Sequence, residues 1–122
     1  MTLVEMSAQG RGESSIDLLG DALTNHESAD DFYAFAMRTL MAGWESLDFI
    51  EKYLAEATIT VIDRAELKRE VEWCLDVTPV PDFPFDMDDV ISSYLGRNEW
   101  NDKELLWTTP DMYCLLCWGT SA

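Results

Sequence analysis

The stretch from residue 28 to residue 56 limits the possible folds more than any other, because it holds the densest apolar pattern in the chain. Apolar residues recur there at spacings of three and four, the period that places side chains on one face of a helix. Ser28 stands where a side chain caps a helix N-terminus, and Asp30 and Asp31 suit the positive end of the helix dipole. The pattern therefore predicts two consecutive helices in an antiparallel hairpin, bent or broken at Gly43. The two apolar stripes consist of Phe32, Phe35, Ala36, Leu40 and Met41, and of Leu47, Ile50, Tyr53 and Leu54.

The remaining segments predict more short helices and two extended connections. Residues 57–62 are rich in β-branched side chains, but no second strand is evident to pair with them, so we expect an extended connector. Three prolines between residues 79 and 84 indicate a stiff linker. Caps and apolar spacings predict the other helices, over residues 15–23, 63–75, 86–95, 105–107 and 112–118.

These elements together predict an all-α fold. Residues 1–14 lack periodicity and are expected to form a loose N-terminal arm, with a short strand as the other possibility. Residues 15–122 are expected to form a single globular domain of six or seven short helices around the central hairpin. An α+β fold that uses residues 57–62 and either terminus as strands is the alternative.

Charge restricts the partners of this domain. The 122 residues include 24 acidic and 8 basic side chains, a formal net charge of −16, although 48% of the residues are hydrophobic as in globular proteins. Such a field repels nucleic-acid phosphates and anionic membranes, and it attracts basic proteins. We therefore expect neither direct nucleic-acid binding nor membrane binding.

Residues suited to catalysis or metal binding are few. His26 is the one histidine and lies in a polar loop, where a surface role is expected, and no nucleophile elbow or phosphate-binding loop occurs. Cys114 and Cys117 have the spacing of zinc ligands, but they fall in an apolar predicted helix and are interpreted as core residues. We expect no catalytic residue, no metal and no cofactor.

Cysteine usage indicates a compartment. The third thiol, Cys74, makes the count odd, and the sequence carries neither a signal peptide nor an apolar run of transmembrane length. These features favour a reducing cytoplasm over a disulfide framework.

Two stretches of the chain contain acidic residues without any basic residue between them. Helix capping accounts for several of these carboxylates, but it does not explain the missing lysines and arginines. We therefore interpret the two stretches as candidate partner-binding regions. Their acidic residues are Glu13, Asp17, Asp21, Glu27, Asp30 and Asp31 in the first, and Glu70, Glu72, Asp76, Asp82, Asp86, Asp88 and Asp89 in the second.

These observations lead to the hypothesis of a non-enzymatic inhibitor that binds a basic nucleic-acid-handling protein and blocks its substrate site. Spaced carboxylates can occupy a groove that otherwise holds a phosphate backbone. Trp44, Trp100 and Trp107 are candidate anchors of such an interface. In size and charge the chain is similar to small acidic immunity proteins that act against nuclease toxins, and to phage proteins that disable restriction or CRISPR effectors.

Two other functions stay open from the sequence. The first is a structural or adaptor protein, a homodimer that uses aromatic helix faces such as those bearing Trp100 and Trp107. The second is a small enzyme or metal-binding protein whose site the sequence does not reveal. Binding that weakens strongly with salt would distinguish the inhibitor from the adaptor.

Overall fold

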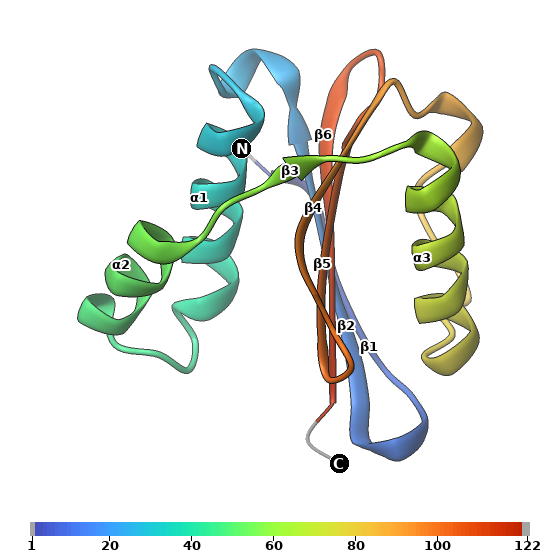
Figure 1. The fold of residues 1–122 in the computed structure, drawn as a ribbon, viewed down its shortest axis with the longest axis horizontal. Coiled ribbons are helices and arrows are strands. Elements are labelled where there is room, and N and C mark those ends of the chain that lie inside the picture. The colour runs from blue at the N-terminus through green and yellow to red at the C-terminus, as the bar shows by residue number, and fades with distance from the viewer. Residues whose placement is uncertain (1, 121–122) are drawn as a thin grey trace.

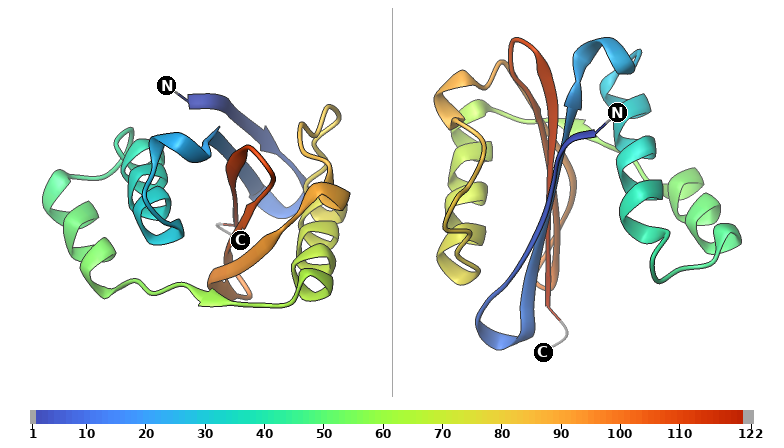
Figure 2. Two further views of the ribbon diagram at one scale, coloured as in Figure 1. Left: turned by 90° about the horizontal axis from the view of Figure 1, so that it is seen from above. Right: turned by 180° about the vertical axis from the view of Figure 1, so that it is seen from behind.

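In the computed structural model, a six-stranded antiparallel sheet separates two layers of helices (Figure 1). The structure describes residues 2–120, with side chains from Val4 onward. Helices α1 and α2 cover one face of the sheet and α3 covers the other, as the view from above also shows (Figure 2). The prediction of an all-α fold is therefore wrong, and the α+β alternative fits in part.

The strand order places the N-terminal and C-terminal segments side by side in the sheet. The order is β1-β2-β6-β5-β4-β3, with every neighbouring pair antiparallel. The helices are α1 (Ala29–Met41), α2 (Leu47–Glu56) and α3 (Arg64–Val77). The strands are β1 (Thr2–Gln9), β2 (Ser14–Ala22), β3 (Thr60–Val61), β4 (Ser92–Glu99), β5 (Asp102–Thr108) and β6 (Met112–Thr120). Short 3-10 turns span Arg11–Glu13, Leu23–Asn25 and Met87–Asp89.

The two helices predicted on either side of Gly43 are confirmed, but they cover one face of the sheet and are not the centre of the fold, and Leu47 of the predicted apolar stripe is exposed. The Ser28 side chain accepts a hydrogen bond from the Asp31 amide at 3.1 Å, as its predicted capping role requires. Gly43 lies in the connection between α1 and α2. The Arg38 guanidinium donates to both carboxylate oxygens of Glu51 at 2.9 Å and so joins the two helices. The helix expected after Asp63 is also present as α3.

Four segments predicted as helices are strands or turns. Residues 15–23 lie mostly in β2, 105–107 in β5 and 112–118 in β6, while 86–95 contain a 3-10 turn and the start of β4. Strands covered by helices on both faces need no alternation of polar and apolar residues, so a short apolar run does not distinguish them from a buried helix. Leu115 and Leu116 illustrate this, because both are fully buried on opposite faces of β6.

Two of the three remaining segments contain strands, and the proline-rich segment has no regular structure. Within residues 57–62, expected to be an extended connector, Thr60 and Val61 pair with β4 as a short edge strand. Residues 1–14 are expected from the sequence to form a loose arm, with a short strand as the other possibility. Residue 1 lies outside the described residues, and Thr2–Gln9 form β1, which pairs with β2 with a register shift between Thr2 and Val4. The proline-rich segment has neither helix nor strand from residue 79 to residue 86, and it is held by the buried Phe85.

Two hydrophobic cores stabilise the three layers. The core under α3 contains Leu67 and Val71 from the helix, and Trp107, which meets Phe85 edge to face. The core under α1 contains Phe32 from the helix. Both cores share the sheet, so β2, β5 and β6 lie in the middle of the molecule.

A close backbone approach joins the turn between β1 and β2 to the end of α3. A Cβ atom on Gly10 would lie 2.6 Å from the Thr78 Cα and 2.8 Å from the Val77 carbonyl oxygen. The Ser14 and Thr78 hydroxyls are hydrogen-bonded at 2.6 Å beside this contact. The turn is therefore packed directly against the helix terminus.

Gly10→Ala is expected to lower the free energy of unfolding by about 1–3 kcal/mol, because backbone atoms must move to admit the methyl group. Urea unfolding of the purified protein measures this change. Gly43→Ala is the control, since a Cβ there would meet nothing within 4 Å. Equal stabilities of the two variants would contradict the close approach at Gly10.

Candidate functional site

The sheet face under α1 changes from apolar to polar along its strands. Residues of β2, β6 and β5 form rows across the sheet, and the apolar row is Leu19, Leu115 and Leu106. The next two rows are Asp17, Cys117 and Glu104, then Ser15, Gly119 and Asp102. Carboxylates from β2 and β5 therefore flank the small residues of β6, which lies between them.

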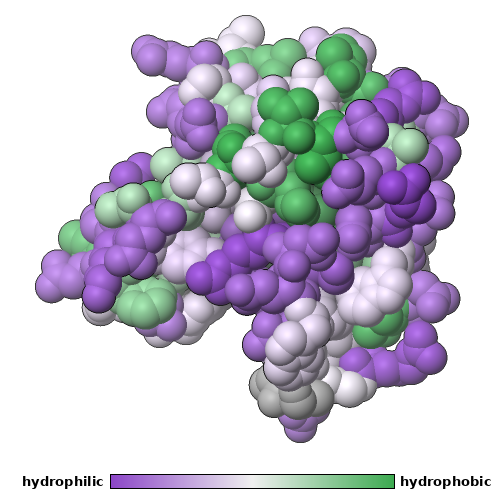
Figure 3. All heavy atoms as spheres, viewed as in Figure 1, coloured by the Kyte–Doolittle hydropathy of each residue, from purple (hydrophilic) through white to green (hydrophobic). Residues whose placement is uncertain are grey.

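These two polar rows form the floor of a groove of about 250 Å³. Its wall is apolar and comes from the end of α1 and the following loop: Met37, Leu40, Met41 and Trp44. Tyr53 of α2 closes one side of the groove. In the space-filling view, the outline of the molecule is notched between the α2 lobe and the lower end of the sheet (Figure 3). The groove thus combines an acidic floor with an apolar wall, and Trp44 is 63% exposed on this wall.

Glu104 is buried in the groove floor and is held by two tyrosines. The Tyr33 hydroxyl of α1 donates to Oε1 at 2.5 Å, and the Tyr53 hydroxyl of α2 donates to Oε2. The Arg97 guanidinium lies over the Tyr53 ring, 5.0 Å from its centroid. Tyr53 and Glu104 also border a second hollow of about 290 Å³, so their hydrogen bond lies between two cavities. This network fixes the position of α2 relative to the sheet.

Burial raises the pKa of Glu104 above its ordinary value, and the hydrogen bonds from Tyr33 and Tyr53 only partly oppose that effect. Burial and the neighbouring Glu104 also raise the pKa values of both tyrosines, which therefore remain protonated as hydrogen-bond donors. The neighbouring carboxylates of the groove have different partners. Ser7 donates to Asp17 Oδ1 at 2.6 Å, and Arg97 donates to Asp102 Oδ2 at 3.0 Å.

Glu104→Gln is expected to change how stability depends on pH. Because folding raises the pKa of Glu104, its contribution to stability is fully present below the unfolded value near 4.5 and is lost as pH rises through the folded value. Glutamine does not ionise, so the variant should gain stability relative to the wild-type protein as pH rises above 4.5. Urea unfolding of both proteins across this pH range measures the difference between their free energies of unfolding. A difference that does not change with pH would contradict the raised pKa of Glu104.

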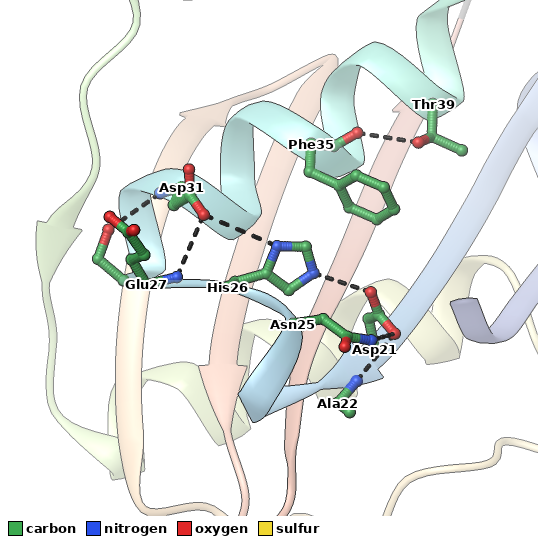
Figure 4. Close-up of polar contacts among 9 residues, drawn as sticks. Asp21, Ala22, Asn25, His26, Glu27, Asp31, Phe35 and Thr39 are labelled. Atoms are coloured by element: carbon green, nitrogen blue, oxygen red, sulfur yellow. Dashed lines mark hydrogen bonds and ion pairs between the residues drawn. The ribbon is translucent and has the colours of Figure 1, made fainter. Parts of the chain in front are cut away.

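His26 is buried, so the expectation of a surface histidine is wrong. Only 6% of its side chain is exposed, and its Nε2 lies 2.8 Å from Oδ2 of Asp21 (Figure 4). The ring also contacts Phe32 and Phe35. On its other side, Nδ1 lies 3.9 Å from the Asp31 carboxylate. His26 therefore joins the end of β2 to the start of α1.

Asp21 is the centre of this junction. Burial disfavours its charged form, but hydrogen bonds from His26, Asn25 and the Ala22 amide outweigh that effect and lower its pKa. Since a carboxylate only accepts hydrogen bonds, Nε2 of His26 is the donor to it. Both oxygens of the carboxylate are therefore occupied by donors within the protein.

The first acidic stretch is divided between four locations. Asp17 lies in the groove, and Asp21 is buried in the junction just described. Glu13 is exposed in the turn between β1 and β2, at the other end of β2. The last three members are exposed around the N-terminus of α1: Glu27, Asp30 and Asp31. The structure does not bring these six residues together.

The second acidic stretch lies on the opposite side of the sheet, on α3 and on the segment that returns beside it (Figure 2). Glu70 is half-buried and accepts a hydrogen bond from Lys103 at 2.9 Å. Six further members are exposed: Glu72, Asp76, Asp82, Asp86, Asp88 and Asp89. Of these, Asp76 lies 3.9 Å from Arg11, and Asp88 lies 3.6 Å from Lys68. The two stretches therefore do not form one continuous face.

The cysteines are free thiols, two in β6 and one, Cys74, on the buried face of α3. Cys114 and Cys117 lie in β6 rather than in a helix, and their spacing of three places them on opposite faces of the strand. Burial raises the pKa values of Cys74 and Cys114 to about 12 and that of Cys117 well above its ordinary value. Thiols with such pKa values stay protonated near neutral pH and are poor nucleophiles.

The candidate tryptophan anchors differ in exposure. Trp107 is fully buried, so it cannot contact a partner. Trp44 borders the groove, and Trp100 is 74% exposed in the turn between β4 and β5. Sequence analysis missed Glu104 and Asp102 as site residues, because both stand in the polar run Asn101–Glu104, where nothing in the sequence sets them apart from surface residues.

Comparison of the chain with protein-family models, with curated proteins and with solved structures gave no match. Between residues 2 and 120, no group of three or more histidine, cysteine or acidic side chains is arranged to hold a metal ion. Over the same residues, none of the helices has the length and apolar character needed to cross a membrane.

Proposed function

We propose that the protein is a non-enzymatic inhibitor that binds a basic, nucleic-acid-handling protein and covers the surface this partner uses for phosphate. The proposal is based mainly on the groove between α1 and the sheet. Its floor offers the half-buried carboxylates of Asp17 and Asp102 on either side of β6, and its wall ends in the exposed Trp44. Carboxylates match lysine and arginine in charge, while an aromatic side chain at the edge supplies apolar contact area.

The charge of the whole protein supports the same partner class. A net charge of −16 steers basic proteins toward the molecule and repels nucleic acid itself. The exposed carboxylates near the N-terminus of α1 and along residues 82–89 contribute to this field without lining the groove. They are proposed to act on the rate of association, whereas the groove is proposed to make the close contacts.

The cytoplasm is the proposed site of action. Three free thiols are present, and two of them are buried in the apolar interior. Reduced thiols of this kind are usual in cytoplasmic proteins.

The alternative of a homodimeric adaptor has less support. It depends on aromatic helix faces bearing Trp100 and Trp107, but Trp107 lies in the core and Trp100 lies in a turn between strands. An exposed apolar surface does occur near β3, where Val61 is 79% exposed and Ile91 is 64% exposed (Figure 3). A dimer through that surface would be insensitive to salt.

Affinity capture tests the proposed function. The tagged protein is incubated with nuclease-treated lysate of host cells or of phage-infected cells, washed at low and at high salt, and bound proteins are identified by mass spectrometry. We expect a basic nucleic-acid-binding protein that is lost at high salt. The purified partner should then release a labelled nucleic acid when the inhibitor is added.

A matched pair of variants tests whether capture depends on the groove. Asp17→Lys with Asp102→Lys reverses two floor charges and should abolish capture, whereas the same change at the exposed Asp82 and Asp89 should only weaken it. Recovery of the bait alone, migrating as a dimer at both salt concentrations, would contradict the inhibitor and favour the adaptor. A captured partner that keeps its nucleic acid in the presence of the inhibitor would also contradict the proposal.

A further inference from the structure

We infer that the groove is a binding site for an arginine side chain of the partner, which lies along β6 with its guanidinium between the carboxylates of β2 and β5. The inference rests on the proposed function and names the chemical group that the groove takes. It is drawn from the shape of the floor, the free oxygens around it and the composition of the wall.

The floor is hollow along β6. Gly119 has no side chain, and a Cβ atom built on it would meet its nearest neighbour, the Asn101 carbonyl oxygen, only at 3.7 Å. Asp17 and Glu104 are one strand away on either side of Cys117. Two strand spacings place their backbones about 10 Å apart. A narrow channel with acidic sides therefore follows the strand from Cys117 toward Gly119.

The carboxylates keep acceptor capacity toward this channel. The hydrogen bond from Ser7 occupies Oδ1 of Asp17, and that from Arg97 occupies Oδ2 of Asp102. In the part of the chain that the structure describes, no hydrogen bond or ion pair involves the other oxygen of either group. Glu104 is buried and both of its oxygens accept tyrosine hydroxyls, so the acceptors open to a ligand are the second oxygens of Asp17 on β2 and Asp102 on β5. Acceptors are therefore available on both sides of the channel.

Arginine fits this arrangement better than lysine. A guanidinium has five N–H donors in a rigid plane and can reach separated carboxylates, whereas an ammonium group is a single point of charge. Guanidinium groups also stack on aromatic rings, and Trp44 borders the groove. The methylene stem would lie against Met37 and Leu40, as the apolar part of long basic side chains commonly does.

The consequence for the partner is direct. Arginine is a preferred residue for bidentate binding of phosphate. An arginine held in the groove cannot bind the phosphate of a nucleic acid at the same time. The groove would therefore block the partner by competition for one of its phosphate-binding side chains.

Three small probes test the inference without the partner: the N-acetyl methylamides of arginine, lysine and citrulline. Citrulline keeps the shape of arginine and lacks its charge. We titrate each probe into the ¹⁵N-labelled full chain at low ionic strength and follow the amides of Cys117 and Gly119 and the indole of Trp44. The arginine probe should shift these signals in a saturable manner, the lysine probe should bind more weakly, and the citrulline probe should cause no saturable shift.

Two variants localise the binding. Asp17→Asn with Asp102→Asn should weaken the arginine probe about tenfold or more, as expected when charge-assisted hydrogen bonds are lost. Gly119→Leu should abolish binding by filling the channel, and Gly119→Ala should retain it. Thermal unfolding of each variant shows whether the fold is intact. Equal binding of citrulline, or binding that survives both Gly119→Leu and the asparagine pair, would overturn the site, and equal binding of lysine would overturn the preference for arginine.

The outcomes separate the two proposals. If the arginine probe fails to bind but a basic partner is captured in a salt-dependent manner, the arginine site is wrong and the inhibitor remains supported. If the probe binds in the groove but no basic partner is captured from any lysate, the site remains supported and the inhibitor is wrong.

Discussion

Asp21→Ala should lower the free energy of unfolding by about 2–4 kcal/mol, because each buried donor that loses its acceptor costs about 1–3 kcal/mol. The change leaves the Nε2 donor of His26 and the Ala22 amide without the buried carboxylate that accepts from them. Because small domains are stable by only about 5–15 kcal/mol, this loss is a large part of the total. It should also loosen the start of α1, which His26 holds against β2.

Urea unfolding at neutral pH measures this effect, with Asp82→Ala as the control. Asp82 is exposed and has no hydrogen bond or ion pair within residues 2–120, so its removal should change stability by at most about 0.5 kcal/mol. Acid unfolding gives a second readout. Because folding lowers the pKa of Asp21, its contribution is present above the unfolded value near 3.8 and is lost as pH falls through the folded value. Asp21→Ala should lack this acid-dependent loss, and similar stabilities of the two variants would show that the junction is unimportant.

Trp44→Ala should weaken the complex with the captured partner about 30-fold or more, which corresponds to about 2 kcal/mol at a central interface residue. The side chain is 63% exposed and borders the groove, so its loss removes contact area from the partner and little from the core. The free energy of unfolding should therefore stay within about 0.5 kcal/mol of the wild-type value.

Isothermal titration calorimetry with the captured partner measures the affinity of each variant. Trp100→Ala is the matched control, because Trp100 is 74% exposed but does not line the groove. If Trp100→Ala weakened the complex as strongly as Trp44→Ala, the contact would extend over the turn between β4 and β5 and the groove would not be its centre.

The helices were predictable because each leaves one face in water. In α1 and α3, the contrast between buried and exposed faces gives the period that the sequence displays, and Ser28 marks a start that the structure confirms. Residues 112–120 lack that contrast, since β6 is covered by helices on both sides. Their apolar run fits a helix and a buried strand equally well in isolation.

The sheet could not be predicted from the sequence for a second reason, which is the distance along the chain between paired strands. Asp17 and Cys117 are neighbours on adjacent strands although they lie about 100 residues apart in the chain. No local pattern specifies such a pair. The groove could not be predicted for the same reason. Asp17 was a candidate because of its charge, whereas Glu104 faces it across β6 only after the sheet has formed.

The position of β6 between β2 and β5 also has a consequence for synthesis. A ribosome delivers the β1–β2 hairpin well before its partner strand, because β6 begins about 90 residues after the end of β2. Until then the free edge of β2 is open to pairing with other nascent chains. Productive pairing of β2 is therefore expected only after β6 has been synthesised, and a chain that terminates before residue 112 should be degraded or aggregate instead of folding.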